Sequence, residues 1–211
     1  MDIQKELCYT LRYRMDTRGR LEKKDWMRAA RLALLEGGPS AVRVETLARK
    51  LGVSKGSFYW HFQDRDALLE ALLREWEEEK SLLSDLLKEG DLPKALASFF
   101  KELERRVVIS ERGEWPSDAA IFGWAAVSPK VARRANKEEE TRIRLLKKLF
   151  RQGDLGDFFY MAYLGFLLRR RRVPEAAKKF PILAKMMQLF VETPRRGPER
   201  VAKSDRGRKK S

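Results

Sequence analysis

Apolar residues recur at the spacing of an α-helix along most of this chain, and this periodicity limits the fold more than any other feature of the sequence. The spacing i, i+3, i+4, i+7 places apolar side chains on one face of a helix. No stretch keeps the alternation of a half-buried strand, and no Asn-Gly or Asp-Gly pair marks a hairpin turn. We therefore predict an all-α protein of about nine helices.

Glycine and proline residues divide the periodic stretches into separate helices. Glycine tolerates the left-handed conformation that ends many helices, and proline fits the first turn of a new one. The predicted helices span residues 23–37, 44–51, 55–61, 64–88, 92–111, 117–127, 129–151, 156–171 and 175–191.

The charge of the chain indicates a polyanionic partner. The formal net charge is +15 at pH 7, which suits nucleic acid or an anionic membrane surface. From Thr193 to the end, eight basic residues stand against two acidic ones, so we expect this tail to be disordered. The tail is either a solubilising segment or a non-specific clamp on DNA, and both interpretations stay open.

Other classes of protein are less compatible with the sequence. Cys8 is the only cysteine, so neither an intrachain disulfide nor a zinc site built on thiolates is expected. The longest apolar run, residues 158–168, is shorter than the roughly 20 residues of a membrane span. The first residues lack the apolar run of a signal peptide, and we expect a cytoplasmic protein with no membrane contact.

The segment from Val44 to Phe62 has the pattern of a helix-turn-helix. Helical spacing places four apolar residues, Val44, Leu47, Ala48 and Leu51, on one face of a short helix. Gly52 can adopt the left-handed conformation of a sharp turn, and Val53 can fill the angle between the helices.

The second helix of this motif is expected to project polar side chains. Ser54 can cap its start, and Phe58 and Phe62, four residues apart, anchor it inward. Lys55, Ser57 and Tyr59 are then left facing outward, on a helix short enough to enter the major groove of DNA. Downstream, Asp64 can cap the next helix.

The run from Leu47 to Leu69, LARKLGVSKGSFYWHFQDRDALL, resembles the signature of TetR-type transcriptional regulators, and the likeness covers about residues 23–72. The resemblance implies base contacts by Lys55, Gly56 and Ser57, and phosphate contacts by Tyr59, Trp60, His61 and Arg65. It also places Glu45 and Thr46, in the first turn of the preceding helix, at the DNA. The residues expected to bind DNA are thus Glu45, Thr46, Ser54, Lys55, Gly56, Ser57, Tyr59, Trp60, His61 and Arg65.

Two residues depart from the family pattern. Arg43 stands where a capping Thr or Ser is usual, and Glu45 stands where a basic or polar residue is common. A carboxylate can accept from cytosine N4 but repels phosphate, so we rank Glu45 below Lys55 as a base contact. His61, the only histidine, lacks any partner motif for catalysis or metal binding; we predict phosphate contact, with structural packing as the alternative.

The resemblance also implies a ligand-binding and dimerisation domain after the helix-turn-helix. Its aromatic residues either line a pocket for a small hydrophobic or aromatic ligand or form the core. Arg105 and Arg106 could meet an anionic ligand, but we interpret them as a solvated helix face. The candidate pocket residues are Phe99, Phe100, Phe122, Trp124, Phe159 and Tyr163.

The predicted organisation follows from these assignments. The two apolar helices near 156–171 and 175–191 are expected to form a homodimer, since one short recognition helix buries too little to be specific. The predicted parts are a flexible basic arm (1–22), which is either disordered or enters the minor groove, a helix-turn-helix domain (23–75), a ligand and dimerisation domain (76–191), and a disordered basic tail (192–211).

The resulting hypothesis is a DNA-binding regulator, not an enzyme and without a cofactor, that represses transcription as a dimer on a palindromic operator and responds to a ligand. The alternatives are a regulator of the same type without a small ligand, a basic helical enzyme, and a membrane-surface protein. No nucleophile–base pair or phosphate-binding glycine loop supports the enzyme.

Overall fold

The computed structural model describes residues 21–78, 88, 92–114, 116–150 and 153–192. Within these ranges the chain forms nine α-helices and two short 3-10 helices and contains no β-strand, which confirms the all-α prediction. The basic arm and tail lie almost wholly outside the described residues. The elements are α2 (Lys23–Gly37), η1 (Pro39–Ala41), α3 (Val44–Leu51), α4 (Gly56–Tyr59), α5 (Arg65–Glu77), α7 (Leu92–Glu111), α8 (Asp118–Ala125), α9 (Pro129–Phe150), α10 (Gly153–Arg172), η2 (Pro174–Lys179) and α11 (Phe180–Glu192).

Several helix boundaries differ from the predictions. The helix predicted over residues 64–88 is described as α5 only to Glu77, and residues 79–87 lie outside the described residues. The helix predicted from residue 175 is wrong at its start: residues 174–179 form η2 instead, and α11 begins at Phe180. Pro181 explains this difference, because it has no amide hydrogen to bond to the preceding turn and fits only the first turn of a helix. The helix α10 begins at Gly153 rather than 156, and α4 is shorter than predicted.

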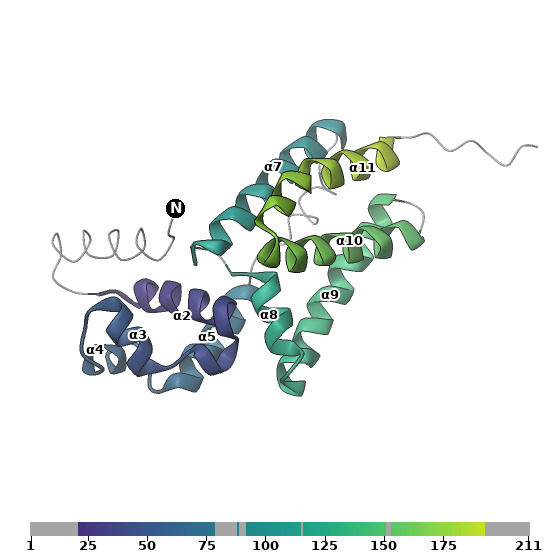
Figure 1. Cartoon of the computed structure of the whole chain (residues 1–211). Coiled ribbons are helices and arrows are strands. Elements are labelled where there is room, and N and C mark those ends of the chain that lie inside the picture. The colour runs from purple at the N-terminus through teal and green to yellow at the C-terminus, as the bar shows by residue number, and fades with distance from the viewer. Residues whose placement is uncertain (1–20, 79–87, 89–91, 115, 151–152, 193–211) are drawn as a thin grey trace, which may run out of the picture.

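The N-terminal helices share a core that does not stop at α5. Trp26 of α2 and Phe58 of α4 are completely buried and meet edge to face, with ring centroids 5.2 Å apart. The same buried cluster includes Ile121 and Trp124 of α8 and Val131 of α9. In Figure 1, α8 accordingly lies between the N-terminal helices and the rest of the molecule.

A second core joins the C-terminal helices. Phe99 and Phe100 of α7, Phe150 of α9 and Phe159 of α10 are buried together with Met187 of α11. Figure 1 shows α7 and α11 side by side, with α10 crossing beneath them. Among the described residues, no helix is both long enough and apolar enough to cross a membrane.

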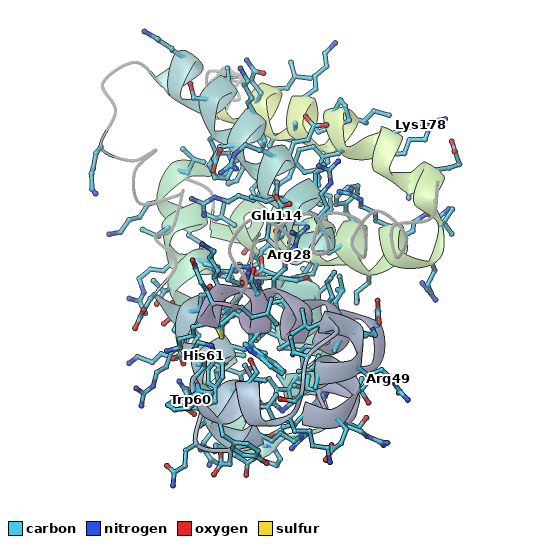
Figure 2. All side chains as sticks on the ribbon, turned by 90° about the vertical axis from the view of Figure 1, so that its left-hand side faces the viewer. Arg28, Arg49, Trp60, His61, Glu114 and Lys178 are labelled. Atoms are coloured by element: carbon cyan, nitrogen blue, oxygen red, sulfur yellow. The ribbon has the colours of Figure 1, made fainter. Side chains whose placement is uncertain are left out.

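Hydrogen bonds and ion pairs connect the N-terminal helices α2 and α5 to the C-terminal part of the chain. Arg31 of α2 donates to the carbonyl of Gly113 (2.6 Å) and to Glu75 of α5 (2.7 Å). Nearby, Arg28 points toward Glu114, 3.2 Å away, as Figure 2 shows. On the other side, Arg134 of α9 holds both Glu70 (2.9 Å) and Glu77 (2.6 Å) of α5. These contacts join α9 and the loop before α8 directly to α2 and α5.

Candidate nucleic-acid interface and adjoining cavity

The turn between α3 and α4 has the predicted geometry. Gly52 adopts a left-handed conformation with φ 70° and ψ 29°, and its amide bonds to the last turn of α3. The amide of Val53 donates to the carbonyl of Ala48 at 3.0 Å. Such paired bonds satisfy the carbonyls that a helix end leaves open, so the angle between α3 and α4 is fixed by the backbone.

The helix α4 is anchored by its aromatic residues and exposes the residues around them. Phe58 and Phe62 are buried and stack at 5.4 Å. Their neighbours point to solvent: Tyr59 is 60% exposed and Trp60 77% exposed. In Figure 1, α4 lies at the end of the N-terminal helices that is remote from α7, α10 and α11, where a long polymer can approach it.

Lys55 and Glu45 form an ion pair across the two helices of the motif. The Nζ atom of Lys55 lies 2.7 Å from Oε1 of Glu45, and both side chains are more than half exposed. The hydrogen bond from Lys55 is the main cause that lowers the pKa of Glu45. Glu45 is therefore a charged residue of the exposed face, and Lys55 partly offsets its repulsion of phosphate.

The guanidinium of Arg65 donates hydrogen bonds to carbonyl groups of the protein backbone. Its Nε donates to the carbonyl of Val42 (2.7 Å) and Nη2 donates to that of Pro39 (2.5 Å). These bonds hold η1 against the start of α5. Asp64 caps α5 as predicted, since its carboxylate accepts from the amide of Ala67 at 2.7 Å. The geometry gives Arg65 a structural role, and its phosphate contact stays a prediction.

His61 also contacts the backbone. Its Nε2 lies 3.1 Å from the carbonyl oxygen of Leu21, so this nitrogen carries the proton and donates. The bond ties the residues before α2 to the end of α4, which agrees with the packing alternative. A phosphate contact would have to use Nδ1, which donates only when the imidazole carries a second proton. In Figure 2, Trp60 lies beside His61 and projects outward from the lower end of the molecule.

The remaining predicted residues lie on the same exposed side. Ser57 and Thr46 are half-buried, whereas Ser54 and Gly56 are exposed. The predicted side-chain cap by Ser54 is wrong: Lys55 occupies the N-cap position without a side-chain bond, and Ser54 contributes its carbonyl, which accepts from the amide of Ser57 (3.1 Å). Lys55 is already in the α-helical region, so the chain enters α4 through a turn of backbone bonds.

Comparison with known protein families agrees with this geometry. Residues 27–72 match the model for bacterial regulatory proteins of the tetR family. The chain carries a tetR-family DNA-binding domain. No curated protein and no solved structure matches the chain. The matched segment runs from α2 into α5 and contains the whole helix-turn-helix, so the chain is a DNA-binding transcriptional regulator.

A cavity lies in the C-terminal part of the chain, between α7, α9, α10 and α11. Its volume is about 110 Å³, and four of the six predicted aromatic residues, Phe99, Phe100, Phe159 and Tyr163, line it. Phe122 and Trp124 do not. Phe122 packs edge to face on Trp76 of α5, and Trp124 belongs to the N-terminal core. Helical spacing could not distinguish Phe122 and Trp124 from the four aromatic residues that line the cavity, because spacing does not show which other helix the apolar face of a helix packs against.

The polar end of the cavity is a network around Asp118, the first residue of α8. Its Oδ1 accepts from Trp76 Nε1 (2.7 Å) and from Arg142 Nη1 (2.7 Å), and its Oδ2 accepts from the Tyr163 hydroxyl (3.1 Å). Burial alone would raise the pKa of Asp118. The attraction of Arg142 and the three hydrogen bonds outweigh burial, and the net result is a lowered pKa.

Among the polar residues that line this cavity, the sequence prediction omitted Asp118, Arg142 and Tyr160, and it placed Arg106 on a solvated helix face. One signal was present, since Arg142 shares helical spacing with Leu146 and Leu149 and so stands on the apolar face of α9. The interpretation of Arg105 and Arg106 as a solvated face holds for Arg105 only. The side chain of Arg105 is half exposed, whereas that of Arg106 is 15% exposed and its residue lines the cavity.

Proposed function

We propose that this protein is a ligand-responsive repressor that binds a palindromic operator as a homodimer. The observation that carries the proposal is the exposed face of α3 and α4, where Lys55, Tyr59 and Trp60 project from helices whose other face is buried. A short, rigidly anchored helix with donors at its start suits base contacts in the major groove.

Exposed apolar residues support dimerisation through α10 and α11. On α10, Phe158, Met161 and Leu168 are exposed at helical spacing, and Gly165 lies between them on the same face. On α11, Ile182, Met186 and Phe190 are exposed four residues apart. Continuous apolar faces on adjacent helices are the usual composition of a homodimer core. We assign this surface, which we call the α10–α11 face, to a second copy of the chain.

The position of the cavity supports a response to a ligand. Asp118 lies in the cavity wall and also bonds to Trp76 of α5, the helix that follows the helix-turn-helix. The loop before α8 contacts α2 through Gly113 and Arg31. A ligand that favours one arrangement of α8 and α9 therefore biases α5 and α2, and with them the separation of the two recognition helices in a dimer.

The proposal is tested by selecting bound DNA from a random pool and measuring fluorescence anisotropy with the selected duplex at moderate salt. We expect a two-fold symmetric site, and we expect Lys55→Ala and Tyr59→Phe each to weaken specific binding about tenfold. Lys178→Ala is the matched control, because Lys178 is also an exposed lysine paired with a glutamate, at 2.5 Å, and lies at the opposite end of the molecule from Trp60 (Figure 2).

Two results would contradict the assignment. If neither Lys55→Ala nor Tyr59→Phe weakens binding more than the Lys178→Ala control does, the DNA contacts lie elsewhere. If the selected sites lack two-fold symmetry, the dimeric arrangement on a palindromic operator is wrong.

A further inference from the structure

The acidic group in the cavity already has its hydrogen-bond partners. The carboxylate of Asp118 accepts from Trp76, Arg142 and Tyr163, all within 3.1 Å. A carboxylate offers about four lone-pair sites, so most of its capacity is used inside the protein. Asp118 is therefore poorly suited to receive a donor group, such as an amine, from a ligand.

The hydroxyl of Tyr160 is in the opposite situation. Tyr160 lines the cavity and is 4% exposed, and its buried hydroxyl oxygen makes no hydrogen bond of normal geometry within the described residues, although Arg142 is near enough to interact with it. Leaving a buried polar group unsatisfied costs free energy, and such groups in native proteins usually mark a site for water or a ligand. Burial is the main cause that raises the pKa of Tyr160, so the hydroxyl keeps its proton and can donate.

Arg142 adds further donors beside Tyr160. A guanidinium carries five N–H groups, more than Asp118 can accept. Its plane is fixed, since the guanidinium carbon lies 5.1 Å from the ring centroid of Trp76 while Nη1 bonds to Asp118. The polar end of the cavity is thus rich in donors and needs an acceptor from outside.

The charges of the lining favour an anionic acceptor. Arg106 and Arg142 are the cationic residues in the lining, and Asp118 is its acidic residue. Glu102, the partner of Arg106 at 3.0 Å, is not among the lining residues. Glu139 also interacts electrostatically with Arg142, but Glu139 is not among the residues that line the cavity.

The remaining lining is apolar, and its size limits the ligand. Phe99, Phe100, Phe159, Leu146 and Met187 surround most of the space, whose volume is about 110 Å³. Since a cavity of about 150 Å³ holds one benzene molecule, the space encloses roughly five non-hydrogen atoms, and the end of a longer ligand would extend through the open side of the cavity.

We propose that the cavity binds a monocarboxylate with an apolar body, whose carboxylate accepts from Tyr160 and Arg142 and whose first few carbon atoms fill the enclosed space. The inference names the ligand class for the ligand response proposed above and rests on that proposal for its biological role. The inference also names the contacts that would couple the ligand to α5. The guanidinium of Arg142 that would hold the ligand also bonds to Asp118, and Asp118 accepts from Trp76 of α5.

The experiment is isothermal titration calorimetry on the full chain with octanoate, octanamide and octylammonium. These probes share the alkyl chain and differ in the end group. We expect octanoate to bind at least about tenfold more tightly than octanamide and octylammonium to bind weakest, since a charge-assisted bond is the stronger one. If octanamide or octylammonium equals octanoate, or if none of the three binds, the proposal is overturned.

Tyr160→Phe tests the contact itself. It should weaken octanoate binding about tenfold without lowering the midpoint of urea unfolding, because among the described residues the hydroxyl makes no hydrogen bond of normal geometry, and Arg142 keeps its bond to Asp118. Tyr59→Phe, on the DNA-facing side, is the control and should leave octanoate binding unchanged. Unchanged octanoate affinity in Tyr160→Phe would overturn the assignment.

A last measurement separates this inference from the proposed function. Operator affinity is measured by anisotropy with and without saturating octanoate. If octanoate binds as expected but operator affinity does not change, the ligand class stands and the ligand response is wrong. If octanamide alone changes operator affinity, the ligand response stands and the carboxylate class is wrong.

Discussion

Two glycines with almost the same φ angle constrain this chain for different reasons. Gly52, in the turn of the helix-turn-helix, has φ 70°, and a β-carbon there would meet no atom within 4 Å. Gly113, in the loop that touches α2, has φ 68°, but its β-carbon would lie 2.7 Å from Leu32 Cγ and 2.8 Å from the carbonyl oxygen of Arg28. The first position needs glycine for its conformation alone, and the second needs it for space as well.

This difference gives a prediction for the free energy of unfolding. Gly52→Ala should lower it by about 1 kcal/mol, the cost of a left-handed alanine. Gly113→Ala should lower it by about 3 kcal/mol or more, because backbone and the core of α2 must also shift. Urea unfolding followed by circular dichroism measures both changes. Equal losses in the two variants would show that the contact of Gly113 with α2 does not constrain the fold.

At the scale of helices, the sequence predicts what depends on local spacing. The bounds of α2, α3 and α7 agree with the predicted ranges, because apolar periodicity and flanking glycines define them. The inward positions of Phe58 and Phe62 follow from the same spacing. The partners of His61 and Arg65 could not be predicted, because the carbonyls of Leu21, Pro39 and Val42 reach them only through the folded chain.

The contact between α8, α9 and α5 through Asp118 gives a prediction about pH. The pKa of Asp118 is lowered in the folded protein, so its stabilising contribution is present above the ordinary carboxyl pKa of about 3.9 and is lost as the pH falls through the folded value. Asp118→Asn should lower the free energy of unfolding by about 3 kcal/mol at pH 7, because it leaves Arg142 without its anionic partner.

Urea unfolding at a series of pH values measures this effect. The difference between the native protein and Asp118→Asn should be constant near neutral pH and should shrink below about pH 4. Asp66→Asn is the control: this carboxylate is exposed, so its removal should change the stability by less than about 1 kcal/mol. A difference for Asp118→Asn that persists unchanged into acid would mean that the ion pair does not support the contact.

At the scale of the whole molecule, the two exposed ends of the protein have different chemistry. One end presents the polar, partly aromatic face of α3 and α4, and the α10–α11 face is apolar. The proposed dimer needs both, since its α10–α11 face is the surface that would bring two copies of the α3–α4 face to a fixed separation. The α10–α11 face can be tested without disturbing the monomer, because Gly165 lies in it and a β-carbon there would meet nothing within 4 Å.

We therefore expect Gly165→Glu to separate the dimer into monomers. A buried carboxylate without a partner is costly in an apolar interface, whereas in the monomer the new side chain only faces water. Gly123→Glu is the matched control, since Gly123 is also an exposed helical glycine with open space around it. Light scattering coupled to size exclusion should give twice the chain mass of 24.7 kDa for the native protein and for Gly123→Glu, and the single mass for Gly165→Glu. Operator affinity should fall only in the monomeric variant, because two separate monomers then bind the two half-sites of the operator independently. If the Gly165→Glu protein stays dimeric, the interface lies on another surface.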